Sequence, residues 1–151
     1  MATREESAIG ICRSIIRSAA GLRRELDKAL LPFGLSGPQF GILHQLEMRG
    51  SMPLGELGKH LWVSCGNVTG LVDKLVEAGY VNRIRTGSDR RVALAELTDR
   101  GRDVLRTVLP SHSEYVLRAT SGLDESELGE LQILLDKVAW FQEDETRYRG
   151  G

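Results

Sequence analysis

The chain has 151 residues, of which 41% are hydrophobic and 27% charged, and its formal net charge is −1. These values are typical of one soluble domain, residues 1–151, with a buried core. No apolar run approaches the roughly 18 residues that a membrane-spanning helix needs. The N-terminus lacks the pattern of a signal peptide, so we expect a cytoplasmic protein.

Residues 5–31 are predicted to form one long amphipathic helix, because apolar residues recur every three or four positions along them. The Pro-Phe-Gly segment at 32–34 is expected to end this helix. Ser36 and Gln39 have the spacing of a capping box. They predict a second helix that stops at Gly50.

The stretch from Leu54 to Leu97 begins with the pattern of two short helices. The first is expected to start at residues 51–53, with proline in its first turn, where a missing N–H costs nothing. The second is expected to start at the N-cap residue Ser64 and to end at Gly79, where a C-cap favours a left-handed residue. The apolar residues that share one face are Leu54, Leu57 and Leu61 in the first helix, and Val68, Leu71, Val72 and Leu75 in the second.

The pattern then becomes alternating, which predicts strands at 80–85 and 92–97 joined by a turn at 86–91. Helix, tight turn, helix and a hairpin with a basic tip are together typical of a winged helix-turn-helix. We assign it to residues 36–99. Such a unit fits DNA because its second helix enters the major groove and its basic loop reaches an adjacent minor groove.

Beyond the hairpin, Thr98 is predicted to cap a helix in which Pro110 causes a kink or a break. Asp124 and Glu127 have the spacing of another helix start. The last helix carries a strong apolar stripe: Leu128, Leu131, Leu134, Leu135, Val138 and Phe141. The outer helices are more apolar than one small winged-helix unit needs, and such stripes usually indicate a partner.

Charge is separated along the chain. Residues 59–91 contain six basic and three acidic side chains, a net charge of +3. Residues 123–146 contain eight acidic side chains and one lysine, a net charge of −7. The basic segment coincides with the predicted DNA-reading unit, which is the distribution expected of a protein that binds phosphate with one region.

The most specific sequence features lie between Ser36 and Gly101. They are the runs VSCGNVTGLVDKLVEAGYVNR at 63–83, SDRR at 88–91 and LTDRG at 97–101. Together they resemble the multiple antibiotic resistance regulator (MarR) family of bacterial transcription factors, and the resemblance covers nearly the whole chain.

This resemblance implies a mainly α fold with a small β-hairpin wing (α+β). It also implies that helices within residues 5–34 and 100–145 intertwine with a second copy to make a homodimer. The expected partner is double-stranded DNA with a pseudo-palindromic operator, since two-fold symmetry presents two recognition helices. Most members are repressors, and release by a small aromatic effector is expected.

Successive residues of a helix are rotated by about 100°, so Gly66, Gly70 and Asp73 fall opposite the apolar stripe of the second helix. Family members often carry an arginine where this chain has Gly70. Because glycine has no Cβ, Gly66 and Gly70 would let the backbone approach DNA closely. The residues that would then read base edges are Cys65, Asn67 and Thr69.

Ser64 and Lys74 are predicted to contact phosphate, which positions the helix without reading sequence. The resemblance assigns Arg91, with Arg90, to the minor groove and Asp89 to holding the wing tip. The complete predicted DNA-binding set is Ser64, Cys65, Gly66, Asn67, Thr69, Gly70, Lys74, Arg85, Asp89, Arg90 and Arg91.

Two residues bear on sensing. Some family members are peroxide sensors with a cysteine in the first helix, which makes a redox-sensing regulator acting through Cys12 an alternative. Cys12 lies on the apolar stripe, however, and a small buried hydrophobe is the favoured interpretation. Trp62 is a candidate lid over an effector pocket, with simple packing of its ring on a helix as the other interpretation.

Other classes of function have little support in the sequence. His44, His60 and His112 have no metal-ligand spacing, and neither a cofactor nor a metal is expected. No nucleophile–base pair or phosphate-binding loop indicates an enzyme. A winged-helix protein–protein adaptor without DNA binding is a further alternative, but a basic wing tip argues against it.

Overall fold

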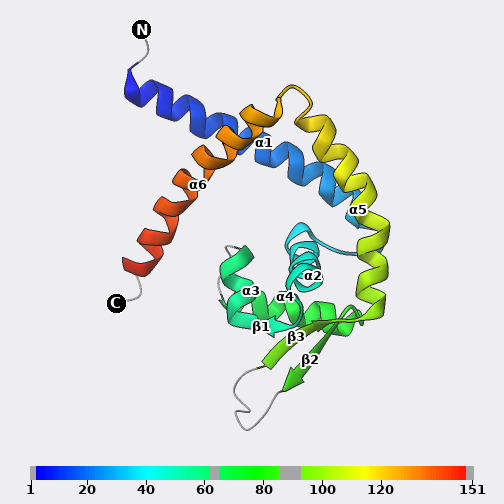
Figure 1. The fold of residues 1–151 in the computed structure, drawn as a ribbon. Coiled ribbons are helices and arrows are strands. Elements are labelled where there is room, and N and C mark those ends of the chain that lie inside the picture. The colour runs from blue at the N-terminus through cyan, green and yellow to red at the C-terminus, as the bar shows by residue number, and fades with distance from the viewer. Residues whose placement is uncertain (1–2, 62–64, 86–92, 149–151) are drawn as a thin grey trace. The chain divides into compact units, whose positions relative to one another are not determined.

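The computed structural model describes residues 3–61, 65–85 and 93–148 (Figure 1). The chain divides into two compact units, residues 1–114 and 115–151, and one long helix contributes to both. The described residues form helices and a small antiparallel sheet, so the predicted mainly α fold with a small wing is confirmed. The elements are α1 (Arg4–Leu30), η1 (Leu31–Phe33), α2 (Gly37–Arg49), β1 (Met52–Pro53), α3 (Leu54–Leu61), α4 (Cys65–Glu77), β2 (Val81–Arg85), β3 (Ala93–Leu97), α5 (Asp99–Ala119) and α6 (Glu125–Tyr148).

Capping boxes begin the first two α-helices. In α1 the Thr3 hydroxyl accepts from the Glu6 backbone N–H, and the Glu6 carboxylate accepts from the Thr3 N–H. In α2 the Ser36 hydroxyl accepts from the Gln39 N–H at 3.4 Å, and the Gln39 side-chain oxygen accepts from the Ser36 N–H at 2.9 Å. Each box satisfies backbone donors that a helix start leaves unpaired. The helix start predicted at Ser36 is confirmed.

The segment before α3 differs from its prediction. Met52 and Pro53 form a short strand rather than the first turn of a helix, and α3 begins at Leu54. Met52 pairs with Ala95 and Pro53 with Leu94, so the hairpin becomes a sheet of three strands in the order β1-β3-β2. Proline is tolerated there because β1 is an edge strand, where one N–H needs no ladder partner.

Strands β2 and β3 form the hairpin predicted at 80–85 and 92–97. β2 starts one residue later than predicted, and Val92, at the predicted start of the second strand, lies outside the described residues. Their antiparallel register runs from Val81 opposite Leu97 to Arg85 opposite Ala93. Val81 and Leu97 are buried, so this face of the sheet closes the core of the first unit. Figure 1 shows the two strands side by side at the end of the unit that carries α4.

One hydrophobic core joins the helices and the sheet of the first unit. It explains why these helices form, because each contributes an apolar face that water would otherwise hydrate. Its largest fully buried side chains are Leu30, Ile42, Leu43, Leu57, Leu75, Leu105, Val68, Val72, Val81 and Val108.

Helix α5 continues through Pro110, so the break considered for this position does not occur. Proline removes the N–H that would bond to the Arg106 carbonyl. Pro110 and Arg106 are both exposed, and water can therefore satisfy that carbonyl. Nearby, the Ser111 hydroxyl donates to the Val108 carbonyl at 3.0 Å.

The second unit contains α6, which begins at the predicted capping box. The Asp124 carboxylate accepts from the Glu127 N–H, and the Glu127 carboxylate accepts from the Asp124 N–H, both at 2.9 Å. Side chains of α6 are described as far as Val138, and the residues of its apolar stripe up to there are exposed.

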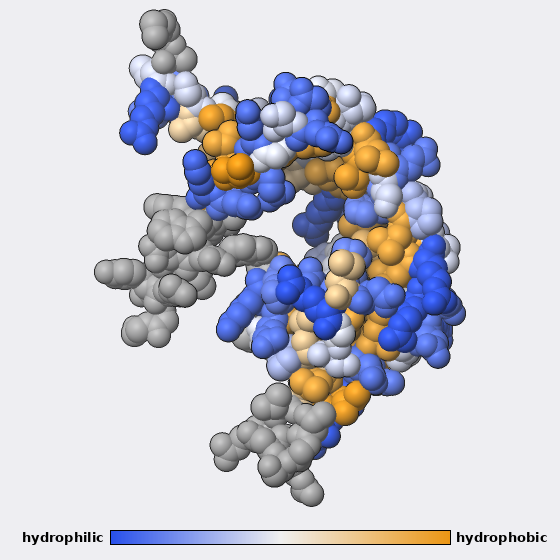
Figure 2. Space-filling view, in the orientation of Figure 1, coloured by the Kyte–Doolittle hydropathy of each residue, from blue (hydrophilic) through white to orange (hydrophobic). Residues whose placement is uncertain are grey.

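Apolar side chains at the surface concentrate on the outer helices, and orange patches mark surface hydrophobic residues in Figure 2. In α1 and α6 such side chains are between 37% and 69% exposed: Ile9, Ile11, Ile16 and Leu22 in α1, and Leu128, Leu131, Ile133, Leu134, Leu135 and Val138 in α6. None of the described helices is both long enough and apolar enough to cross a membrane.

Cys12 lies on α1 and is exposed, so its interpretation as a buried hydrophobe is wrong for the single chain. The reason is that the N-terminal half of α1 leaves its apolar stripe uncovered, with Ile9 and Ile16 exposed as well. The periodicity identified the stripe correctly, but it did not reveal whether this chain alone covers it.

Candidate nucleic-acid interface

Helix α4 has a buried side and an exposed side. Val68, Val72 and Leu75 are fully buried in the core. The exposed residues from Asn67 to the end of the helix are Asn67, Thr69, Gly70, Asp73, Lys74, Val76 and Glu77. A Cβ added at Gly70 would meet no atom within 4 Å, so the helix backbone there is open to a large partner. The orientation expected from the helical period is confirmed, while the DNA contacts themselves stay a prediction.

The remaining predicted contacts are only partly described. Cys65 and Gly66 lie in the first turn of α4, at the N-terminal end of the helix, where the helix dipole is positive. Arg85 ends β2 and is exposed. Four of the predicted contacts lie outside the described residues: Ser64, Asp89, Arg90 and Arg91. The effector candidate Trp62 lies outside them as well.

The C-terminal end of α4 is fixed by a glycine cap. Gly79 has φ of 77°, a conformation that side chains with a Cβ rarely adopt. The Tyr80 N–H donates to the Leu75 carbonyl at 2.9 Å, and the Gly79 N–H donates to the Val76 carbonyl at 3.0 Å. This pair of bonds is the Schellman arrangement. It turns the chain directly from α4 into β2 and confirms the helix end predicted at Gly79.

Hydrogen bonds of Thr98 connect the same turn to the start of α5. Its hydroxyl donates to the Gly79 carbonyl at 2.8 Å and accepts from the Gly101 N–H at 3.1 Å. Its own N–H donates to the Tyr80 carbonyl at 3.1 Å. Gly101 is required there, because a Cβ would collide with the Tyr80 carbonyl oxygen and with Leu97. The base of the hairpin is therefore held to both α4 and α5.

An ion pair that the sequence reasoning missed joins α4 to the hairpin. The Arg83 Nη2 lies 2.7 Å from the Asp73 Oδ1. The helical period predicts that Asp73 lies on the exposed side of the helix, but no role for Arg83 is predicted from the sequence. Strand alternation contained the missing signal, since Arg83 shares a sheet face with the buried Val81, next to α4.

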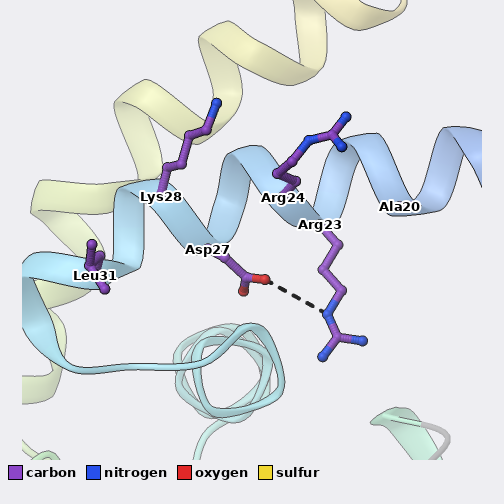
Figure 3. Close-up of a pocket in the computed structure, with 6 residues that line it drawn as sticks. All are labelled: Ala20, Arg23, Arg24, Asp27, Lys28 and Leu31. Atoms are coloured by element: carbon purple, nitrogen blue, oxygen red, sulfur yellow. Dashed lines mark ion pairs between the residues drawn. The ribbon is translucent and has the colours of Figure 1, made fainter.

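A pocket of about 450 Å³ lies along α1 (Figure 3). The side chains of Arg24 and Lys28 extend from one side of the helix, while Arg23 and Asp27 extend from the other. The Arg23 Nε lies 3.8 Å from the Asp27 Oδ2. Lys28 Nζ lies 2.6 Å from Glu25 Oε1, so two of the three cations that line the pocket have a carboxylate partner. No function for this surface is predicted from the sequence.

Two histidines flank one aromatic ring in the first unit. The Phe40 ring centroid lies 6.2 Å from that of His44 and 5.7 Å from that of His112. His112 Nδ1 is buried and has no hydrogen-bond partner among the described residues. Among the residues that the structure describes, no group of three or more His, Cys, Asp or Glu side chains is placed to hold a metal ion.

The model of the MarR family matches residues 35–93, the segment from shortly after η1 to the first residue of β3. The HTH-type transcriptional regulator YkoM of Bacillus subtilis (strain 168) is 32% identical over 133 residues, which are 88% of this chain and 86% of YkoM. The chain belongs to the MarR family. The family resemblance found in the sequence is thereby confirmed.

Solved structures of MarR-family regulators have the same fold. Sco3205 from Streptomyces coelicolor, solved in complex with DNA, superposes with a TM-score of 0.81 at 30% identity, covering 92% of this chain and 88% of Sco3205. AbsC from the same species gives 0.82 at 27% identity, covering 95% and 98%. The protein is thus a MarR-family helix-turn-helix transcriptional regulator and not an enzyme.

Proposed function

We propose that this MarR-family protein is a homodimeric repressor that binds a pseudo-palindromic site on double-stranded DNA and is released by a small-molecule effector. The observation that carries DNA binding is the exposed side of α4, where Asn67, Thr69, Gly70 and Lys74 face solvent opposite a fully buried stripe. Because its buried stripe is packed in the core, α4 can enter a major groove with its exposed side and remain folded. The DNA-bound structure of Sco3205, at 30% identity, supports this assignment.

The roles proposed for individual residues follow from their chemistry. Cys65, Asn67 and Thr69 read base edges, while Gly66 and Gly70 allow close approach. Ser64, Lys74 and Arg85 contact phosphate. Arg90 and Arg91 enter the minor groove and Asp89 holds the wing tip. Residues 36–99 then form the DNA-binding part of a single MarR-like domain.

The dimer is proposed from the outer helices, within residues 5–34 and 100–145. Their exposed isoleucines and leucines are typical of a surface that a partner covers. A second copy is the partner that brings two α4 helices onto one DNA duplex, which doubles the contacts and reads both half-sites.

The effector is proposed to be a small aromatic anion. The pocket on α1 offers Arg24, whose side chain extends on the same side of the helix as Lys28 (Figure 3), together with the apolar Leu31. Such a combination suits a carboxylate or phenolate attached to a ring. Binding would shift the spacing of the two α4 helices through a difference in affinity between two states of the dimer.

The test is a fluorescence anisotropy titration with DNA from upstream of the protein's own gene, at several salt concentrations. Wild-type protein is expected to bind this upstream DNA more tightly than random DNA. Its affinity should fall steeply as the salt concentration rises. Arg91→Ala should lose most of the preference. The exposed Arg106, on α5, supplies the control Arg106→Ala, which should bind as wild type.

Equal binding of wild-type protein to upstream and random DNA would contradict an operator at that position. A pool of randomised duplexes then decides between the remaining outcomes. Failure to enrich any sequence would overturn the proposed function and favour the adaptor alternative, while enrichment would locate the preferred site elsewhere and keep the function.

A further inference from the structure

The ion pair between Asp73 and Arg83 lies where a carboxylate is unfavourable for DNA binding. Asp73 is on the exposed side of α4, one turn from Gly70 and next to Lys74, and its side chain is 53% exposed. An unpaired carboxylate there would repel the phosphates of a duplex lying on this face. Arg83, 35% exposed, neutralises that charge from β2.

The ion pair lies far from the turn at Gly79, so it can constrain the angle between α4 and the hairpin. Asp73 is six residues before Gly79, on the order of 9 Å along the helix. Arg83 is four residues after it, about 13 Å along the strand. The hydrogen bonds of Gly79, Tyr80 and Thr98 hold the two elements together at the turn. A second connection far from that turn fixes the angle between α4 and β2 more firmly than those bonds alone.

We propose that Asp73 and Arg83 are positioning residues that set the angle between the recognition helix α4 and the wing hairpin, so that both elements engage one DNA duplex. This inference rests on the DNA-binding function proposed above. Asp73 contributes through Arg83 and not through a base or phosphate of its own. The pair therefore favours specific complexes, in which helix and wing must both fit, over non-specific ones.

Neutralising the carboxylate separates this role from simple electrostatics. If Asp73 were only a surface charge near DNA, Asp73→Asn would remove a repulsion and tighten binding. If it positions the wing, Asp73→Asn weakens binding to the preferred duplex by about two- to fivefold, the range that the loss of an exposed ion pair allows. Non-specific binding should stay the same or tighten, so the ratio of specific to non-specific affinity falls.

Glu77→Gln provides a matched control. Glu77 lies one turn further along α4, is exposed, and has no ion pair with any residue that the structure describes. Removing its charge changes the helix as Asp73→Asn does, but leaves Arg83 paired. The control should bind the preferred duplex as tightly as wild type or more tightly.

The duplex used is the one that the wild-type protein enriches from a pool of randomised DNA, measured by anisotropy beside an unselected duplex. Arg83→Asp alone should lose specificity, and Asp73→Arg with Arg83→Asp should recover part of it, because the reversed pair can form again. All variants should melt within a few degrees of wild type, since an exposed ion pair contributes little stability.

Tighter binding of Asp73→Asn to the selected duplex, or no recovery in the reversed double variant, would overturn the positioning role while leaving the proposed function intact. If the wild-type protein enriches no sequence at all, the DNA-binding function fails and the inference fails with it.

Discussion

The winged-helix part of the first unit and helix α6 of the second unit bury their leucines to very different extents. Leu57 and Leu75 are 0% exposed, whereas Leu131 is 41% and Leu134 58% exposed. Both regions have apolar residues at helical spacing, so the pattern alone does not distinguish them. The winged helix closes a core with its own three-stranded sheet, whereas the described part of the α6 stripe is exposed in the single chain.

The largest effect that separates the two regions is expected from truncating a leucine in each. Leu75→Ala removes fully buried methyl groups and should lower the free energy of unfolding by about 2–5 kcal/mol at every protein concentration. Leu134→Ala should act only through association, so its effect on the melting temperature should vary with protein concentration. Thermal melts over a range of concentrations measure both. A concentration-independent loss in Leu134→Ala would place that residue in the chain's own core.

Charges on the α6 stripe should abolish association without unfolding the winged helix. Leu131→Glu with Leu135→Glu is expected to weaken binding to a pseudo-palindromic duplex by roughly a hundredfold, because each α4 then binds its half-site alone. Ser126→Glu with Gln132→Glu adds the same charge off the stripe and should bind as wild type. Equal losses in the two variants would mean that acidic charge, and not loss of the dimer, weakens DNA binding.

A smaller effect is expected at Gly70, where helix stability and DNA docking oppose each other. Gly70→Ala should leave stability unchanged or raise it by up to about 1 kcal/mol, because alanine is the better helix former. Its Cβ points into open space in the free protein but would reach a docked groove, so operator affinity should fall. Gly129→Ala in α6 should raise stability in the same way without changing affinity. Wild-type affinity in Gly70→Ala would contradict close docking.

Much of the fold could be predicted because its signals are local. The capping boxes at Ser36 and Asp124 depend on side chains three residues away, and the glycine cap at Gly79 depends on one residue's conformation. The exposed side of α4 followed from its period, since Val68 and Leu75 had to share the buried face.

The errors concern features that depend on distant neighbours. Pro53 fits a helix start by itself, but pairing with Leu94 makes it a strand. Cys12 lies on an apolar stripe, yet its exposure depends on what covers that stripe. The partner of Asp73 is ten residues away across a tight turn, and only the fold of the hairpin brings Arg83 to it.

We propose that a second copy covers the exposed apolar faces of α1 and α6 and so places two α4 helices on one DNA duplex. Light scattering after size exclusion, with and without the selected duplex, measures how many chains are present in each species. The expected mass of the free protein is close to twice the 16.7 kDa of one chain, with two chains on each duplex. A mass of one chain in solution and one chain on each duplex would contradict it.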